Sequence, residues 1–252
     1  YTNKVLIKIK IMSEFKFPTE IVELPSKGFI YPKDNPLSSG KVEVKYMTAR
    51  EEDILTNQSY ITKGTVLDKL LESVIISKID MDDLIVGDKN ALLIATRILG
   101  YGKDYEVEIK GVVENIDLSQ LENTNFDFSL ITQGVNEFEF LLPNSKTPIT
   151  FKILTAKDEK GVESEIKGLK RLNKDASPEL STRLKHMILS VKGDTEKKAI
   201  RDFVDNYLLA RDSKALRDYV KAIQPDVDLN VTLESGSEVR VPIGLRFFWP
   251  DA

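Results

Sequence analysis

The side chains that most often carry chemistry are scarce in this chain, beginning with histidine. His186 is the only histidine, and there is no cysteine. Without them, Cys-His pairs and multi-histidine metal sites are excluded, and any Ser-His-Asp triad would have to use His186. On its predicted helix, His186 lies between Leu184 and Met187 but off the apolar stripe, so we expect an exposed surface histidine. Lack of cysteine also removes disulfides, thiolate nucleophiles and thiolate metal sites.

A cluster of acidic residues invites a calcium interpretation, which its spacing does not support. Asp80, Asp82 and Asp83 lie within four positions. An EF-hand loop counted from Asp80 would place Ile85 where glycine is needed and Ala91 where a bidentate glutamate is needed. We instead expect Asp82 or Asp83 to open a short helix, where a carboxylate suits the positive end of the helix dipole.

Two short motifs resemble catalytic or phosphate-binding sequences only in part. GYGK at 100–103 lacks the glycine spacing and the following Ser or Thr of a phosphate loop, so it predicts the end of a helix. SSGK at 38–41 matches an SxxK pattern but lies in a turn that follows Pro36, without partner motifs. Paired carboxylates leave a hydrolase or lyase as a remote alternative. The sequence therefore predicts no catalytic residue, no cofactor and no metal site.

The bulk composition is that of a globular protein. The chain has 252 residues, of which 41% are hydrophobic and 30% charged, with a net charge of −4. This is enough chain to bury a core, and the charge gives no reason to expect nucleic acid as a partner. The basic stretch 157–201 is interpreted as solvated helix faces. No apolar run is long enough to span a bilayer, so we expect no membrane association.

A phrase near the beginning recurs about a hundred residues later. VEVKYMTAREEDIL at 42–55 is echoed by ITFKILTAKDEKGV at 149–162. In the first copy Thr48 precedes Glu51 by three residues, and in the second Thr155 precedes Asp158 at the same spacing. This is the spacing of a capping box, in which the carboxylate accepts a hydrogen bond at the start of a helix. The repeated phrase therefore predicts a strand leading into a capped helix.

A fainter echo follows. DKNALLIATRILGYGKDYEVEI at 88–109 can be laid over DSKALRDYVKAIQPDVDLNVTL at 212–233, which places Asp88 on Asp212. Each copy predicts a helix, a turn and an alternating strand. We interpret the two echoes as a degenerate internal duplication, with chance similarity of short stretches as the alternative.

The predicted class is α+β, with two duplicated halves in which strands lead into a capped helix, further helices and a returning strand or hairpin. Apolar stripes predict helices at 66–75, 180–191 and 199–208. Alternation predicts strands at 41–47, 104–110, 136–142, 147–154, 227–234 and 238–243. The organisation expected is an extension or arm at 1–11 that need not be native, a first half at 12–113, an irregular connection at 114–135 and a second half at 136–252.

Two segments are candidates for binding a partner. The aromatic run Phe247, Phe248, Trp249 and Pro250 cannot face one way on a strand, so at least one ring should point away from the core. Aromatic residues dominate interface hot spots, although the rings could equally cap the core. The second candidate is the proline-rich segment containing Leu24, Pro25, Phe29, Tyr31 and Pro32.

Several collinear phrases resemble one phage family. They are ELPSKGFIYP, LSSGKVEVKYMTAREEDILTN, VLDKLLESVI, IDMDDLIVGDKNALLIATRILGYGKDYEVEI and PIGLRFFWP. From Leu24 to Trp249 the chain resembles the baseplate hub subunit or hub assembly protein family of T-even-type contractile-tailed bacteriophages. The resemblance implies a non-enzymatic role in tail morphogenesis, with no catalytic residues to carry over.

The resemblance also implies the partners and the location. The expected partners are other baseplate or tail hub proteins, with neither nucleic acid nor membrane, and a homo-oligomer is compatible with the sequence. The expected location is the host cytoplasm during assembly. An assembly factor that binds hub proteins and leaves is the preferred role. A permanent hub subunit of the virion is the alternative.

Overall fold

The computed structural model describes residues 18–109, 112–125, 127–172, 178–233 and 235–248. Helices and small antiparallel sheets make up this part of the chain, which confirms the α+β class. Predictions that concern residues 1–11, Trp249 and Pro250 lie outside the described residues.

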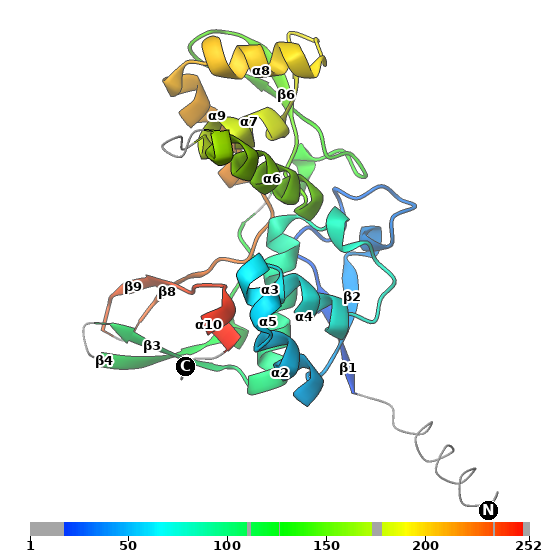
Figure 1. Cartoon of the computed structure of the whole chain (residues 1–252), viewed down its shortest axis with the longest axis vertical. Coiled ribbons are helices and arrows are strands. Elements are labelled where there is room, and N and C mark those ends of the chain that lie inside the picture. The colour runs from blue at the N-terminus through cyan, green and yellow to red at the C-terminus, as the bar shows by residue number, and fades with distance from the viewer. Residues whose placement is uncertain (1–17, 110–111, 126, 173–177, 234, 249–252) are drawn as a thin grey trace, which may run out of the picture.

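Figure 1 shows two lobes. The first lobe contains β1 (Thr19–Glu23), β2 (Lys41–Lys45), α2 (Ala49–Leu55), α3 (Gln58–Lys63), α4 (Val66–Val74), α5 (Val86–Tyr101), β3 (Asp104–Ile109) and β4 (Val112–Asp117). The second lobe contains β5 (Phe138–Leu141), β6 (Pro148–Phe151), α6 (Ala156–Leu172), α7 (Glu179–Met187), β7 (Ile188–Val191), α8 (Lys197–Asn206) and α9 (Ala210–Ile223). The chain then returns to the first lobe with β8 (Asn230–Thr232), β9 (Glu238–Arg240) and α10 (Leu245–Phe248).

Both lobes begin with the same arrangement of strands. β1 pairs with β2, and β5 pairs with β6, each as an antiparallel pair. In each lobe a later helix leads directly into a third extended segment. This helix is α4 in the first lobe and α7 in the second, and the extended segment lies beside the second strand of the pair. Ile75, directly after α4, bridges Val44 of β2, while β7, directly after α7, pairs with β6.

Both lobes also carry the predicted helix cap, with one further contact. The Glu51 carboxylate accepts from the Thr48 backbone N–H at 2.8 Å and from Lys45 Nζ at 2.8 Å. In the second lobe Asp158 accepts from the Thr155 N–H at 3.1 Å and from Lys152 Nζ at 2.7 Å. The lysine lies on the preceding strand or its exit in both cases, so one carboxylate fixes the angle between strand and helix.

A buried aspartate holds the hairpin turn in each lobe. Asp88, the third residue of α5, accepts from the Ser26 backbone N–H at 3.0 Å and from the Tyr31 hydroxyl at 2.6 Å. Asp212, the third residue of α9, accepts from the backbone N–H groups of Asn144 and Ser145.

The two turns also begin alike in sequence. Leu-Pro-Ser at 24–26 follows β1, and Leu-Pro-Asn at 142–144 follows β5. The matched turns, caps and element order together support the predicted duplication. The second lobe differs from the first in two ways. Its α6 is longer than α2, and it contains α8 where the first lobe has only the short 3-10 turn Met81–Asp83.

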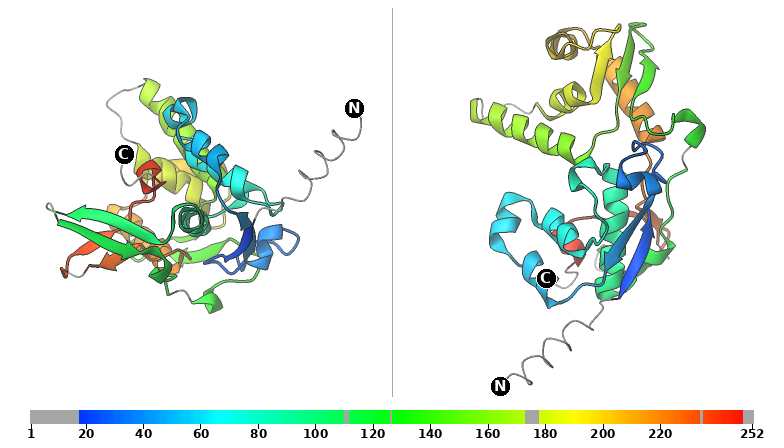
Figure 2. Two further views of the ribbon diagram at one scale, coloured as in Figure 1. Left: turned by 90° about the horizontal axis from the view of Figure 1, so that it is seen from below. Right: turned by 90° about the vertical axis from the view of Figure 1, so that its right-hand side faces the viewer.

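The structure corrects several predicted boundaries. The connection expected from residue 114 begins inside β4, which forms a hairpin with β3. The predicted helix at 180–191 ends at Met187 because residues 188–191 form β7. The predicted second half, 136–252, is divided between the two lobes. Its β8–β9 hairpin lies beside β3–β4 of the first lobe (Figure 2), where the Ser235 N–H donates to Glu114 at 3.2 Å.

Helix α5 is the central element of the first lobe. It contacts β1, α4 and α10, and Leu92 and Leu93 are buried. Gly102 ends α5 with a φ of 85°, a conformation that glycine adopts without strain, as expected for the GYGK turn.

Candidate functional site: the junction of the two lobes

The two described C-terminal aromatics are part of the core and do not form an exposed anchor. Phe247 is 0% and Phe248 1% exposed. The Phe247 ring lies 5.3 Å from the Tyr105 ring, and its carbonyl accepts from Arg97 Nε at 3.0 Å. The partner-anchor prediction is therefore wrong for these two residues, because α10 is a short helix whose neighbouring side chains both turn inward. Trp249 and Pro250 lie outside the described residues.

The proline-rich segment is also largely buried. Leu24, Pro25 and Tyr31 lie in the core of the first lobe, because the turn after β1 folds back onto Asp88. Phe29 is half-buried, with its ring 5.0 Å from that of Phe128. Only Pro32 of the predicted set is exposed. The segment therefore packs against its own lobe, which corrects the idea that it lies along a partner.

His186 differs from its predicted exposure. It is half-buried, and its Nε2 lies 3.0 Å from Oε2 of Glu165. Arg201 donates two bonds to the same carboxylate, at 2.6 and 2.7 Å, and this lowers the pKa of Glu165 to about 2, with a further contribution from His186. The three residues come from α7, α6 and α8, so the cluster ties these helices together.

The two lobes meet through close backbone contacts. The Ala156 N–H donates to the Leu84 carbonyl at 2.7 Å, which joins the start of α6 to the segment before α5. A β-carbon added at Gly87 would lie 2.0 Å from the carbonyl oxygen of Pro225. Glycine at this position therefore allows α5 to touch the segment that follows α9.

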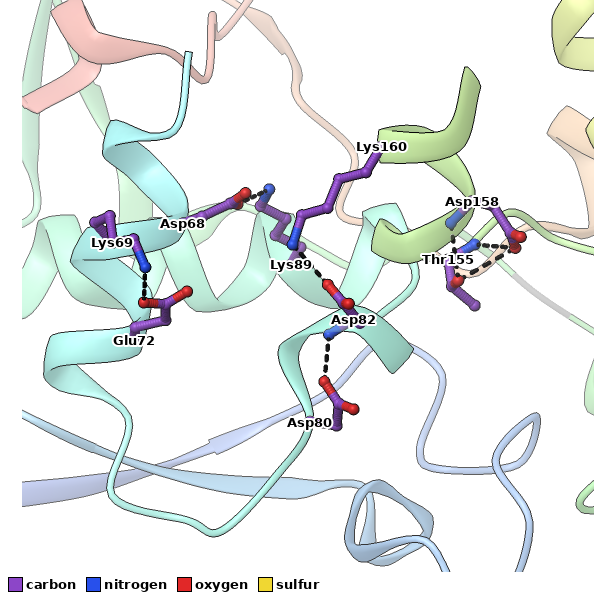
Figure 3. Close-up of polar contacts among 9 residues, drawn as sticks. All are labelled: Asp68, Lys69, Glu72, Asp80, Asp82, Lys89, Thr155, Asp158 and Lys160. Atoms are coloured by element: carbon purple, nitrogen blue, oxygen red, sulfur yellow. Dashed lines mark hydrogen bonds and ion pairs between the residues drawn. The ribbon is translucent and has the colours of Figure 1, made fainter. Parts of the chain in front are cut away.

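A charged cluster flanks this junction (Figure 3). Lys160 of α6 pairs with Asp82 at 2.6 Å across the lobes, and Lys89 of α5 pairs with Asp68 of α4. Hydrogen bonding to Asp82 raises the pKa of Lys160, with further contributions from Asp68 and other nearby acids. Asp80 caps the Asp82 N–H at 2.9 Å, so Asp80 opens the short helix that was expected to start at Asp82 or Asp83.

One ion pair of the cluster, Lys160–Asp82, joins the two lobes, and its other ion pairs lie within the first lobe. Its lysines and the acids facing them are paired, so the arrangement joins surfaces and leaves no coordinating set open. Within the described residues, no group of three or more His, Cys, Asp or Glu side chains is placed to hold a metal ion. Nor does any helix of the described chain combine the length and apolar character needed to cross a bilayer.

A groove opens where α7 and α9 meet the segment 224–230. Its volume is about 410 Å³. The apolar part of its lining is Met187, Val220, Val227 and Leu229. The charged part of its lining is Arg183, Arg217, Lys221, Arg240, Asp226 and Asp228. The groove therefore combines apolar side chains with an excess of cationic groups, although the whole chain is acidic.

The groove residues were missed in the sequence. Arg183 is the only one of the four cations that falls in the stretch noted as basic, which was interpreted as solvated helix faces. Arg217 and Lys221 lie four residues apart on α9, which gives a weak helical signal, but Arg240 comes from β9. Only the folded chain brings them together.

No protein-family model matches the chain, and no match is found among the curated proteins or the solved structures. Its function must therefore be inferred from its own residues.

Proposed function

We propose that this protein acts in assembly of the central baseplate hub of a contractile phage tail, as a non-enzymatic assembly factor that binds hub proteins. The observation that carries the proposal is the set of collinear phrases from Leu24 to Trp249, which resemble the hub subunit or hub assembly protein family. These phrases fall in the first lobe and in the returning C-terminal segment, which pack together as one unit.

The way in which the buried acids are used supports a scaffold role. Glu51, Asp88 and Asp212 are inaccessible to solvent, and each accepts hydrogen bonds from its own lobe. Carboxylates that act on a substrate must face it, whereas these three hold turns and helix starts in place. This favours protein binding over a carboxylate-based hydrolase or lyase.

An assembly factor is favoured over a permanent hub subunit by the nature of the surface. Obligate interfaces are large and more apolar than other surfaces. In the described chain most of the exposed large apolar residues lie on different elements, such as Ile21 on β1, Leu141 on β5 and Leu172 at the end of α6. A permanent subunit of the virion remains the second candidate, because the resemblance covers both roles.

The test is quantitative mass spectrometry of purified phage particles beside the infected-cell lysate. We expect the protein in the host cytoplasm during assembly and not in finished particles. A fixed small ratio to hub proteins in the particles would replace the assembly-factor proposal with the structural-subunit one. If deletion of the gene leaves baseplate hubs and infectious particles at normal levels, the proposed role in hub assembly is wrong.

A further inference from the structure

We propose that the groove between α7, α9 and the segment 224–230 docks an acidic peptide segment with interspersed apolar side chains. The inference rests on the proposed function for the source of the segment, a hub protein, but the groove itself can be tested separately. The occupant is defined by the two kinds of side chain that line the groove.

The floor of the groove suits apolar side chains. Met187 of α7 and Val220 of α9 lie beside Val227 and Leu229 of the following segment, and all four line one hollow. Its volume of about 410 Å³ lies within the usual size of binding pockets, roughly 300–1,000 Å³. A leucine-sized side chain placed there would be removed from water, which is the main favourable contribution to most protein association.

Three of the four rim cations form no salt bridge within the described residues, and the acids nearest to them are Asp218, beside Arg217 and Lys221, and Asp228, beside Arg240. In the described part of the chain, Arg183 forms a salt bridge with Glu159. Arg217 donates its Nε to the Ser213 carbonyl at 3.3 Å, and neither Lys221 nor Arg240 forms a salt bridge in this part of the chain. All four side chains are exposed. Three exposed cations without a salt bridge in this part of the chain therefore lie at one hollow, where carboxylates of a partner can reach them.

The two acids of the groove are already committed. Asp226 accepts from Asn90 Nδ2 at 3.0 Å and from the Val227 N–H at 2.8 Å. Asp228 accepts from the backbone and side chain of Asn230. Their charge remains in the groove and disfavours a densely charged phosphate backbone. A peptide can space its carboxylates to face the cations while apolar residues fill the floor.

A second hollow extends the surface along α6. It is lined by Ile166 of α6 and Leu180 of α7, and it shares Arg183 and Arg217 with the first. Leu180 is 46% exposed. The lysines at this hollow are paired, Lys167 with Glu163 and Lys170 with Glu179. The positive charge is thus concentrated at the first hollow, and the second offers apolar contact to the continuing peptide.

The local charge has a consequence for selectivity. The chain as a whole carries a net charge of −4, so its overall charge does not attract an acidic partner. Charge complementarity confined to one groove orients the partner and raises its rate of association more than its final affinity. The groove therefore selects where an acidic segment binds.

The test measures fluorescence anisotropy of a fluorescein-labelled peptide of alternating Glu and Leu, with a Lys-Leu peptide and a single-stranded dT oligonucleotide as comparison probes. We expect the Glu-Leu peptide to bind the whole protein and the Lys-Leu peptide not to bind. Reversal of two groove charges, Arg217→Glu with Lys221→Glu, should weaken binding at least tenfold. The matched control is Arg50→Glu with Lys63→Glu, two exposed cations of the first lobe that change the net charge equally and should alter binding less than twofold.

A second variant, Arg240→Gln, guards against a folding defect, because it makes a milder change on a different element and should weaken binding severalfold. The inference is overturned if the wild type does not bind the Glu-Leu peptide, if the groove and control variants bind it equally, or if the oligonucleotide binds more tightly than the peptide. Co-purification from infected cells separates the two proposals. If the groove variant retains hub proteins as well as the wild type does, only the groove proposal is refuted. If the wild type retains no hub protein, the proposed function is refuted.

Discussion

Asp88 and Asp212 occupy the same place in the two lobes. Each is the third residue of its helix, and each accepts hydrogen bonds from the turn after the first strand of its hairpin. The donors differ. Asp88 accepts from one backbone N–H and from the hydroxyls of Ser26 and Tyr31, whereas Asp212 accepts from two backbone N–H groups and the Asn144 amide. Because the donors differ, replacing each aspartate by asparagine should lower the free energy of unfolding by a different amount.

Asparagine should be tolerated at position 88 and not at position 212. In Asp212→Asn the new amide NH₂ must face a backbone N–H, so we expect the free energy of unfolding to fall by about 2 kcal/mol. In Asp88→Asn the NH₂ can donate to the two hydroxyls, which also accept from the Gly28 and Ile85 N–H groups, but the hydroxyl protons lose their acceptor, so we expect a smaller cost of about 1 kcal/mol. Burial raises the pKa of Asp88, which also makes a neutral side chain less costly there. Urea unfolding of both variants measures the difference, and equal costs would contradict it.

Acid should destabilise the protein through Glu51 and Asp212. Burial alone would raise the pKa of Glu51, but hydrogen bonds from Lys45, Ser73 and Thr48 outweigh it and lower the pKa to about 2. Bonds from Asn144 and Ser145 likewise outweigh burial and lower the pKa of Asp212 to about 2. Both groups are protonated more easily in the unfolded chain. Their stabilisation is therefore present above the ordinary carboxyl pKa of about 4 and is lost as pH falls towards 2.

The measurement is the urea midpoint between pH 7 and pH 3. Wild type should be nearly constant above about pH 5 and fall below it. Glu51→Gln should begin less stable and show a shallower fall. A variant curve parallel to that of the wild type would mean that Glu51 does not contribute to the acid sensitivity.

Gly87→Ala should disturb the contact between the lobes. The added β-carbon would lie 2.0 Å from the Pro225 carbonyl oxygen and 2.7 Å from the Asp226 α-carbon, and both are backbone atoms. We expect a loss of about 1–3 kcal/mol of stability. The control is Gly168→Ala on α6, where the new β-carbon meets nothing within 4 Å. That change should add about 0.5–1 kcal/mol, because alanine favours helix more than glycine does. Thermal unfolding of both variants gives the signs, which should be opposite.

Phe247→Ala should lower the stability of the protein itself, independently of any partner. The side chain is fully buried, so its truncation should cost about 3–5 kcal/mol. Leu172→Ala, at a residue 87% exposed, should change stability by less than about 0.5 kcal/mol. Calorimetry on both proteins tests this. A Phe247 variant that is as stable as wild type but fails to co-purify hub proteins would restore the anchor interpretation.

Features with local causes could be predicted from the sequence. The junctions at Thr48–Glu51 and Thr155–Asp158 depend on residues three positions apart, so their spacing alone revealed them. The Gly102 turn depended on an equally local pattern. The sequence also placed Asp88 opposite Asp212, although it gave no sign of what either residue binds.

Features with distant causes could not be predicted. Asp88 meets Ser26 across 62 positions, and no spacing rule connects them. The aromatic run was misinterpreted because strand alternation was applied to it, whereas in α10 successive residues differ by about 100° and both rings reach the core. The groove combines α7, α9 and β9, so its charge became visible only in the folded chain.

The return of α10 to α5 sets an order of events during synthesis. Arg97 is 3% exposed, and its Nε is satisfied by the carbonyl of Phe247, 150 positions later. While the ribosome is still translating the second lobe, this guanidinium has the carbonyls of Gly102 and Asp104 and the Tyr101 ring as partners, but not the Phe247 carbonyl. The earliest-made lobe is therefore closed last, after the second lobe has emerged and residues 245–248 have docked. A nascent or truncated chain would thus carry a first lobe that lacks this closing contact.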